Sequence, residues 1–188
     1  GAIPNRMMFT TNSPNAKIWA SVVAEKLGIP LDVDVINGVS NTINGGNYAQ
    51  GGSRVSNPIG VANNPAIGIT TIPVTQQIDR LLADTPSFNR NDLVALWAGS
   101  NDGFVQFATV AAGAITPQAA LAEMSTAATQ LLAQIDRLKA AGAQNIVVIT
   151  VPNLGVTPQA QIIEDGSVSG TAAPGSIALL NALSASFN

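Results

Sequence analysis

With 188 residues, 46% of them hydrophobic and only 10% charged, the chain has enough apolar material for one folded domain, and its composition argues against disorder. A formal net charge of −3, with no basic run, excludes the electrostatic footprint of a nucleic-acid-binding protein. The chain contains no cysteine and no histidine, which excludes thiolate catalysis and removes the commonest general base and metal ligand. We therefore expect no nucleic-acid partner, no cofactor and no metal site.

The amino-terminal quarter predicts one helix and one short strand. A polar cluster at residues 10–13 can cap a helix, and apolar residues at helical spacing predict that helix over residues 14–27. Gly28 and Pro30 should end it. Its predicted buried face consists of Trp19, Val22, Val23 and Leu27. Residues 32–36 alternate charged and aliphatic side chains, which is typical of a short strand near a sheet edge.

Residues 37–64 are rich in Asn, Gly and Ser and resemble a linker in composition, but they include a motif at residues 47–54 with the glycine pair Gly51-Gly52. Paired glycines allow the backbone to adopt positive φ or to approach a ligand closely, although such a pair alone is more often a simple turn. Ile72-Pro73 then predicts the start of a short helix, because proline suits a first helical turn. The residues expected to point inward from this helix are Val74, Ile78, Leu81 and Leu82.

A continuous apolar run at residues 93–98 stops abruptly in the polar tetrad Gly99-Ser100-Asn101-Asp102. The run is too short to span a membrane and too continuous for a half-exposed strand, so it predicts a buried, central parallel strand. Open α/β sheets bind ligands at the carboxyl ends of such strands. The tetrad is therefore a candidate functional site.

The longest predicted helix covers residues 117–141, with Thr116-Pro117 as cap and first turn and Gly142 as its end. Its predicted buried stripe is Met124, Ala128, Leu131, Ile135 and Leu138. A second apolar run at residues 145–151 predicts another central parallel strand. The strand–helix–strand order over residues 93–151 is that of a βαβ unit, which is almost always right-handed. We expect a turn at residues 152–155, a loop at 165–175 and a helix from residue 176 onwards.

Two polar loops thus stand at predicted strand ends, one at Gly51-Gly52 and one at residues 99–102. A glycine backbone N–H and an asparagine side-chain amide are neutral donors of the kind that stabilise the oxyanion of acyl transfer. The alternative is that Asn101 and Asp102 simply cap the helix that follows them.

Four segments, in family order, resemble the GDSL or SGNH lipases and esterases. Residues 99–102 match the third block of that family, Gly-x-Asn-Asp, and residues 47–52 (Asn-Tyr-Ala-Gln-Gly-Gly) look like its second block. Residues 151–158 are similar to the Pro-Asn-Leu-Gly-x-Thr-Pro segment of secreted and autotransporter-type bacterial members. Residues 9–12, with Trp19, resemble the stretch that follows the nucleophile block in those members.

The resemblance implies a single SGNH-hydrolase-like domain over residues 1–188. Its fold would be three-layer α/β/α, flavodoxin-like, with a mainly parallel central sheet. It also implies a serine ester hydrolase that acts through an acyl-enzyme on a small-molecule or lipid ester. Gly52 would supply a backbone N–H and Asn101 its side-chain amide to the oxyanion hole, with Gly51 as the alternative to Gly52. The resemblance and the low charge content indicate a secreted protein or one at the bacterial outer-membrane surface.

The chain departs from the family pattern at both ends. No Gly-Asp-Ser-Leu nucleophile block is present, and an Asp-x-x-His block is missing because the chain has no histidine. We therefore expect an internal portion of a larger enzyme, incomplete at both ends and inactive alone, whose partners include the missing N- and C-terminal segments. Ser53 and Ser100 lie beside the donors but have no candidate base and no Gly-x-Ser-x-Gly elbow, so we do not expect either to be the nucleophile.

Two other classes of function compete with the hydrolase. One is a non-catalytic α/β binding module that kept the fold and lost the catalytic triad. The other is a nucleotide-binding α/β protein, which is disfavoured because Gly51-Gly52 is not part of a Gly-x-Gly-x-x-Gly fingerprint. We expect Tyr48 and Trp97 to be packing residues rather than substrate platforms, and Arg54 to be solvated or to anchor its loop.

Overall fold

The computed structural model describes residues 17–29, 31–33, 35–36, 39–40, 45–61, 71–167 and 172–188. Its helices are α1 (Trp19–Leu27), α2 (Val74–Asp84), α3 (Ser100–Ala111), α4 (Pro117–Ala140), the 3-10 helix η2 (Leu154–Val156), α5 (Pro158–Asp165) and α6 (Ser176–Phe187). Its strands are β1 (Asp32–Val33), β2 (Val35–Ile36), β3 (Val39–Ser40), β4 (Gly45–Asn47), β5 (Leu93–Trp97) and β6 (Asn145–Ile149).

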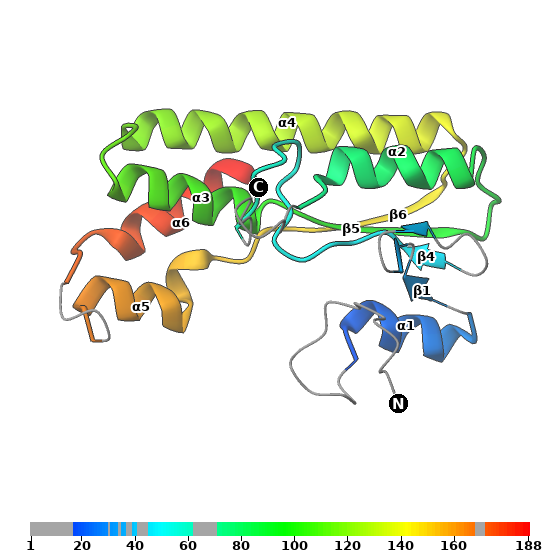
Figure 1. Cartoon of the computed structure of the whole chain (residues 1–188), viewed down its shortest axis with the longest axis horizontal. Helices are drawn as coiled ribbons and strands as arrows, with labels where there is room; N and C mark the ends of the chain where they lie inside the picture. Colours follow the sequence, from blue (N-terminus) through cyan, green and yellow to red (C-terminus); the bar gives the residue numbers. More distant parts are fainter. Residues whose placement is uncertain are drawn as a thin grey trace.

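Strands β5 and β6 run parallel and in full register, from Leu93 opposite Asn145 to Trp97 opposite Ile149. The chain between them forms α3 and α4, so the predicted strand–helix–strand unit is confirmed. Within the described residues, β1 also pairs with β4 in parallel, and β2 pairs with β3 in antiparallel orientation. Helices α2 and α4 lie on one side of the strands and α1 lies on the other (Figure 1). The fold is α/β with parallel strands, as predicted.

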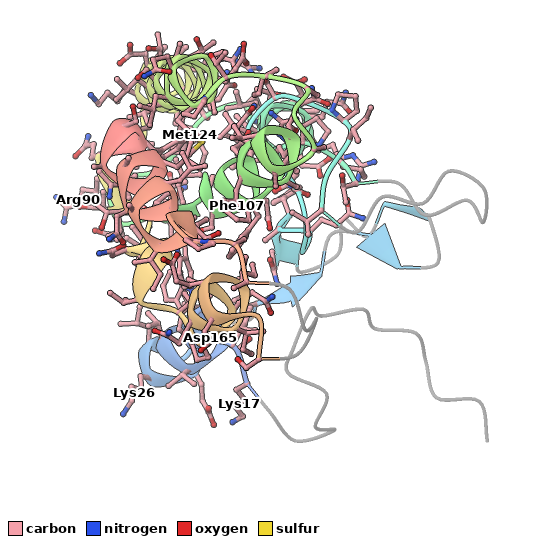
Figure 2. All side chains as sticks on the ribbon, turned by 90° about the vertical axis from the view of Figure 1, so that its left-hand side faces the viewer. Lys17, Lys26, Arg90, Phe107, Met124 and Asp165 are labelled. Atoms are coloured by element: carbon pink, nitrogen blue, oxygen red, sulfur yellow. The ribbon has the colours of Figure 1, made fainter. Side chains whose placement is uncertain are left out.

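Helix α4 takes part in two hydrophobic clusters, one at each half of its length. Its carboxyl half packs with β5, α2 and Val55; this first cluster consists of Val55, Val74, Ile78, Val94, Leu96, Ala98, Ala127, Leu131, Leu138 and Ala143. Its amino half packs with α5, α6 and η2; this second cluster consists of Ala120, Met124, Val151, Leu154, Ala160, Leu180 and Leu183. Figure 2 shows Met124 beneath α4, between α3 and α6. Burying one such side chain completely stabilises the fold by about 1.5–3 kcal/mol.

The ring of Phe187, at the end of α6, packs against both clusters. It also lies directly against Gly99, where a Cβ atom would come within 2.5 Å of the ring. Gly99 has a φ of 102°, a backbone conformation that is strained for any residue with a side chain. The turn from β5 into α3 therefore requires glycine for two reasons.

The predicted strands are shorter and more exposed than the sequence indicates. β5 ends at Trp97 and β6 at Ile149. Val94 and Leu96 are buried, but Leu93 and Trp97 on the alternate positions are 44% and 53% exposed. The prediction of a strand buried on both faces is therefore wrong for the described structure. The reason is that α2 and α4 pack on only one face of β5.

Helix α1 begins at Trp19, later than the predicted start at residue 14, because Ile18 is extended and Lys17 is not helical. It ends before Gly28 as predicted. Gly28 has a φ of 68°, which is typical of a helix-ending glycine. The predicted buried face of this helix is wrong: Trp19 and Leu27 are exposed, and the buried residue is Ala24. Helix α1 contributes no residue to either hydrophobic cluster. The predicted cap at residues 10–13, residues 14–16, the segment 9–12 and Pro30 lie outside the described residues.

Two helices begin with the same Thr-Pro pair. Thr116 accepts a hydrogen bond from the Ala119 N–H and opens α4 where the sequence predicts it. Thr157 accepts one from the Ala160 N–H and opens α5, a helix that is absent from the predicted elements. The signal for α5 was therefore available in the sequence.

The amino end of helix α6 is capped by a side chain of helix α5. Its own cap residue, Gly175, has no side chain, and the Glu164 carboxylate of α5 accepts hydrogen bonds from the Gly175 and Ile177 N–H groups, both at 2.9 Å. These hydrogen bonds hold the pKa of Glu164 below its usual value of 4.5, and the bond from the Ile177 N–H has the larger effect. A carboxylate at the positive end of a helix dipole is stabilised in the same direction.

The first prediction follows from this cap. Because the folded-state pKa of Glu164 is lowered, its contribution is present above the unfolded pKa of 4.5 and is lost as pH falls through the folded pKa. We expect Glu164→Gln to be less stable than wild type at pH 7, with the gap closing in acid. Urea unfolding midpoints measured between pH 7 and pH 3 check this. A gap that stays constant over that range contradicts it.

The second prediction concerns Gly99. Gly99→Ala should lose stability through both the positive φ and the contact with Phe187, about 2–4 kcal/mol in total. Gly113→Ala is the matched control, because Gly113 has a φ of 69° and an added Cβ atom would meet no other atom within 4 Å. It should lose only about 1 kcal/mol. Thermal unfolding of the two variants checks the difference, and equal losses would contradict the packing contribution.

Candidate functional site

A pocket of about 200 Å³ opens at the carboxyl end of β5, lined by Trp97, Ala98, Gly99, Ser100 and Asn101. These residues cover the last residue of the strand, the glycine turn and the first turn of α3. The pocket therefore lies where the sequence predicts a site, at the end of a parallel strand and the start of a helix. The first backbone N–H groups of a helix lack intrahelical partners and favour negative charge nearby.

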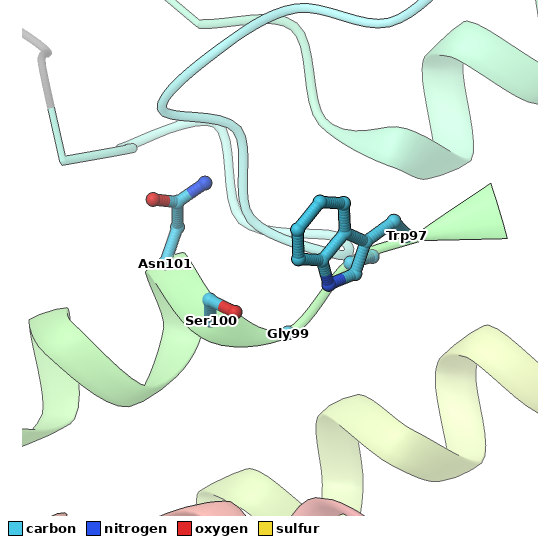
Figure 3. Close-up of a pocket in the computed structure, with 5 residues that line it drawn as sticks. Trp97, Gly99, Ser100 and Asn101 are labelled. Atoms are coloured by element: carbon cyan, nitrogen blue, oxygen red, sulfur yellow. The ribbon is translucent and has the colours of Figure 1, made fainter. Parts of the chain in front are cut away.

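The Asn101 amide projects from the first turn of α3, with its nitrogen directed toward the loop of residues 48–61 (Figure 3). Its Nδ2 atom donates a hydrogen bond of 2.8 Å to the carbonyl oxygen of Ser53. An amide nitrogen carries two hydrogens, so this bond orients the group and leaves one hydrogen for another acceptor. Asn101 is half-buried.

The glycine pair lies next to this contact. Gly52 has a φ of 80°, which accounts for glycine at this position, whereas Gly51 has no positive φ. The Gly52 carbonyl accepts a hydrogen bond of 2.9 Å from the Val61 N–H, which closes the loop on itself. The structure thus brings Gly52 within one residue of the Asn101 contact, but neither Gly51 nor Gly52 is part of the pocket wall.

The loop after the glycines is fixed to the start of α2. The Val74 and Thr75 N–H groups, at the amino end of α2, donate to the carbonyls of Arg54 and Val55, both at 3.0 Å. The Ser53 hydroxyl donates to the Ile72 carbonyl at 2.7 Å. Ser53 is 5% exposed. Its hydroxyl is thus engaged in a hydrogen bond that joins the loop to the start of α2.

A buried ion pair joins this loop to α3. Asp102 is 3% exposed and Arg54 is 9% exposed. The Arg54 Nε atom donates to Asp102 Oδ1 at 3.1 Å, and the Val55 N–H donates to Asp102 Oδ2 at 3.0 Å. Both carboxylate oxygens are therefore used to hold the loop. Of the two roles expected for Arg54, loop anchoring is confirmed and solvation is wrong.

Burial raises the pKa of the Asp102 carboxyl above its usual value of 3.8. Loss of hydration is the largest effect, and the Val55 N–H and the Arg54 guanidinium oppose it. The hydrogen-bond geometry stabilises the ionised carboxylate of Asp102, because both of its oxygens accept hydrogen bonds. Both charges have lost their hydration and depend on each other. Removal of either partner alone would therefore leave an uncompensated buried charge and destabilise the fold.

Sequence reasoning missed this ion pair, although a signal was present. Arg54 follows the glycine pair by two residues, and Asp102 follows Asn101 directly. A basic residue thus lies close to one predicted donor and an acidic residue close to the other. In a chain with only 8 basic and 11 acidic residues, the proximity of these two charges to the donors favours pairing over solvation.

Tyr48, which was expected to be a packing residue, donates a hydrogen bond of 3.1 Å from its hydroxyl to the Asp84 carboxylate. Trp97 lines the pocket with half of its surface exposed.

Among the residues that the structure describes, no group of three or more His, Cys, Asp or Glu side chains could hold a metal ion. In the same part of the chain, none of the helices combines the length and the apolar character needed to cross a membrane.

Comparison with known proteins identifies the family of this chain. The family model described as GDSL-like Lipase/Acylhydrolase matches residues 6–188. The chain belongs to this family. It is also 28% identical over 155 residues to a protein of Arabidopsis thaliana named GDSL esterase/lipase 6. That match covers 77% of this chain but only 41% of the length of the relative.

The third prediction tests the buried pair. Asp102→Asn keeps the shape but removes the charge that balances Arg54 and faces the Val55 N–H with an amide, so it should cost about 3 kcal/mol of unfolding free energy. Asp79→Asn is the matched control, since Asp79 pairs with Arg137 at 2.6 Å but both side chains are 42–57% exposed. It should cost less than about 1 kcal/mol. Urea unfolding at pH 7 measures both, and equal losses would contradict the buried role.

Proposed function

We propose that this chain supplies the oxyanion hole and the core of a serine ester hydrolase that acts through an acyl-enzyme. The observation that carries the proposal is the Asn101 amide, which lines the pocket at the end of β5 and is oriented by the Ser53 carbonyl. Membership of the GDSL-like Lipase/Acylhydrolase family supports ester hydrolysis as the reaction class.

In the proposed mechanism, a serine oxygen attacks the carbonyl carbon of the ester while its proton passes to a general base, and the carbonyl π electrons move onto the carbonyl oxygen. The Asn101 amide and the backbone N–H of Gly52 then donate hydrogen bonds to that oxyanion. Collapse of the intermediate expels the alcohol, which leaves with a proton from the general base, and water releases the acid in a second cycle of the same kind. Neutral, preoriented donors suit this task because the charge develops only in the transition state.

The nucleophile and the general base of this mechanism come, in our proposal, from segments of the same enzyme outside these 188 residues. The observations behind this are the lack of histidine in the chain and the structural bond of the Ser53 hydroxyl. We propose a small-molecule or lipid ester as substrate. From the low charge content we also propose that the enzyme is secreted or lies at a bacterial outer-membrane surface, which fractionation of the producing cells would test.

The test of activity uses the product of the complete reading frame that contains this chain. A fluorophosphonate probe should label it covalently on a serine, with loss of fluoride, and it should hydrolyse short p-nitrophenyl esters. Absence of both labelling and hydrolysis would contradict the proposal. It would favour the alternative, a non-catalytic α/β binding module, for which ester analogues should still bind without turnover.

The fourth prediction tests the oxyanion role. Asn101→Ala should lower kcat by about 10²–10³-fold while KM changes little, because the lost bond forms mainly in the transition state. Asn145→Ala is the matched control: Asn145 lies at the opposite end of the same strand pair, where it donates to the Arg90 and Asp92 carbonyls. It should leave kcat unchanged. Steady-state kinetics on one ester measure both variants, and an unchanged kcat for Asn101→Ala would remove that residue from the mechanism.

A further inference from the structure

The two proposed oxyanion donors belong to separate segments of the chain. Gly52 lies in the loop before α2, and Asn101 lies on the first turn of α3. Donors must lie about 2.7–3.1 Å from the oxyanion to stabilise it, so their position relative to one another matters as much as their presence. The fold must therefore fix the loop against α3.

The contacts between the two segments form one continuous set beside the donors. Asn101 binds Ser53, the residue after Gly52, and Asp102 binds the next two residues, Arg54 and Val55. The single Asp102 carboxylate accepts hydrogen bonds from a side chain, that of Arg54, and from a backbone N–H, that of Val55. They therefore fix the course of the loop backbone as well as the Arg54 side chain.

Burial strengthens the ion pair that connects the loop to α3. Arg54 and Asp102 are the charged residues among the buried polar residues of the described chain, and each is the counter-ion of the other. A charged hydrogen bond in a low-dielectric site is stronger than a neutral one, and its loss leaves an uncompensated charge. The Arg137–Asp79 pair, in contrast, is exposed, and solvent screens its attraction.

We propose that Arg54 and Asp102 are positioning residues for catalysis, whose buried ion pair holds the Gly52 loop and the Asn101 amide in the arrangement that one oxyanion requires. This inference rests on the proposed ester-hydrolase function. Neither side chain touches the substrate in this proposal. Their effect on the reaction passes through the two donors.

The fifth prediction tests this role in the full-length enzyme with a p-nitrophenyl ester. Arg54→Gln should lower kcat by about 10²-fold with little change in KM, since the misplaced donors act on the transition state. Arg54→Lys keeps the charge and should restore part of kcat. Arg137→Gln, which breaks the exposed pair, is the matched control and should leave kcat unchanged.

A double-mutant cycle separates positioning from a general loss of structure. If Arg54 acts through the donors, the loss from Arg54→Lys should shrink in an Asn101→Ala background, so that the two losses do not multiply. Losses that multiply in full, or an effect on KM alone, would overturn the inference. Urea unfolding checks that each variant is folded, and if Arg54→Gln does not fold, the cycle with Arg54→Lys decides the question.

The outcomes for this inference and for the proposed function are distinct. If wild type turns over ester and Asn101→Ala lowers kcat, but the Arg54 variants behave like Arg137→Gln, the positioning role is wrong and the hydrolase proposal stands. If the wild-type enzyme neither reacts with fluorophosphonate nor hydrolyses ester, both fail.

Discussion

The carboxylate of Asp102 is the interaction on which the site depends. It lies in the first turn of α3, where the helix dipole favours a negative charge, and it accepts hydrogen bonds from Arg54 and from the Val55 backbone. The same loop supplies the carbonyls that accept the first N–H groups of α2. One buried carboxylate thus connects the starts of two helices through a single loop, and the Asn101 amide lies beside it.

Two hydrophobic clusters meet beside the site. Helix α4 runs through both clusters, and Phe187 packs against both while it covers Gly99. The turn that presents Asn101 is consequently packed against the Phe187 ring at Gly99 and hydrogen-bonded to Ser53 at Asn101. A catalytic donor benefits from such support, because it then stabilises charge without having to reorganise.

Much of the architecture could be predicted from periodicity and capping residues. The helix beginning at Thr116-Pro117, the parallel pair β5–β6 and the end of α1 at Gly28 all follow from local signals. Burial was predicted less well: Trp97 and Leu93 are exposed although they lie in a continuous apolar run, and Trp19 and Leu27 do not face a core. An apolar pattern shows which residues can be buried, but the packing of other elements decides which of them are.

For the site, the residue types and the family could be read from local sequence signals, namely the glycine pair and Asn101 after an apolar run. These are local properties, since a glycine at positive φ or an amide after a strand is specified by neighbouring residues. Three contacts depend on packing instead: Arg54 is buried against Asp102, Ser53 orients Asn101, and Glu164 caps α6. Each of these joins segments distant in the chain, and such pairings are set by how the helices pack rather than by sequence spacing.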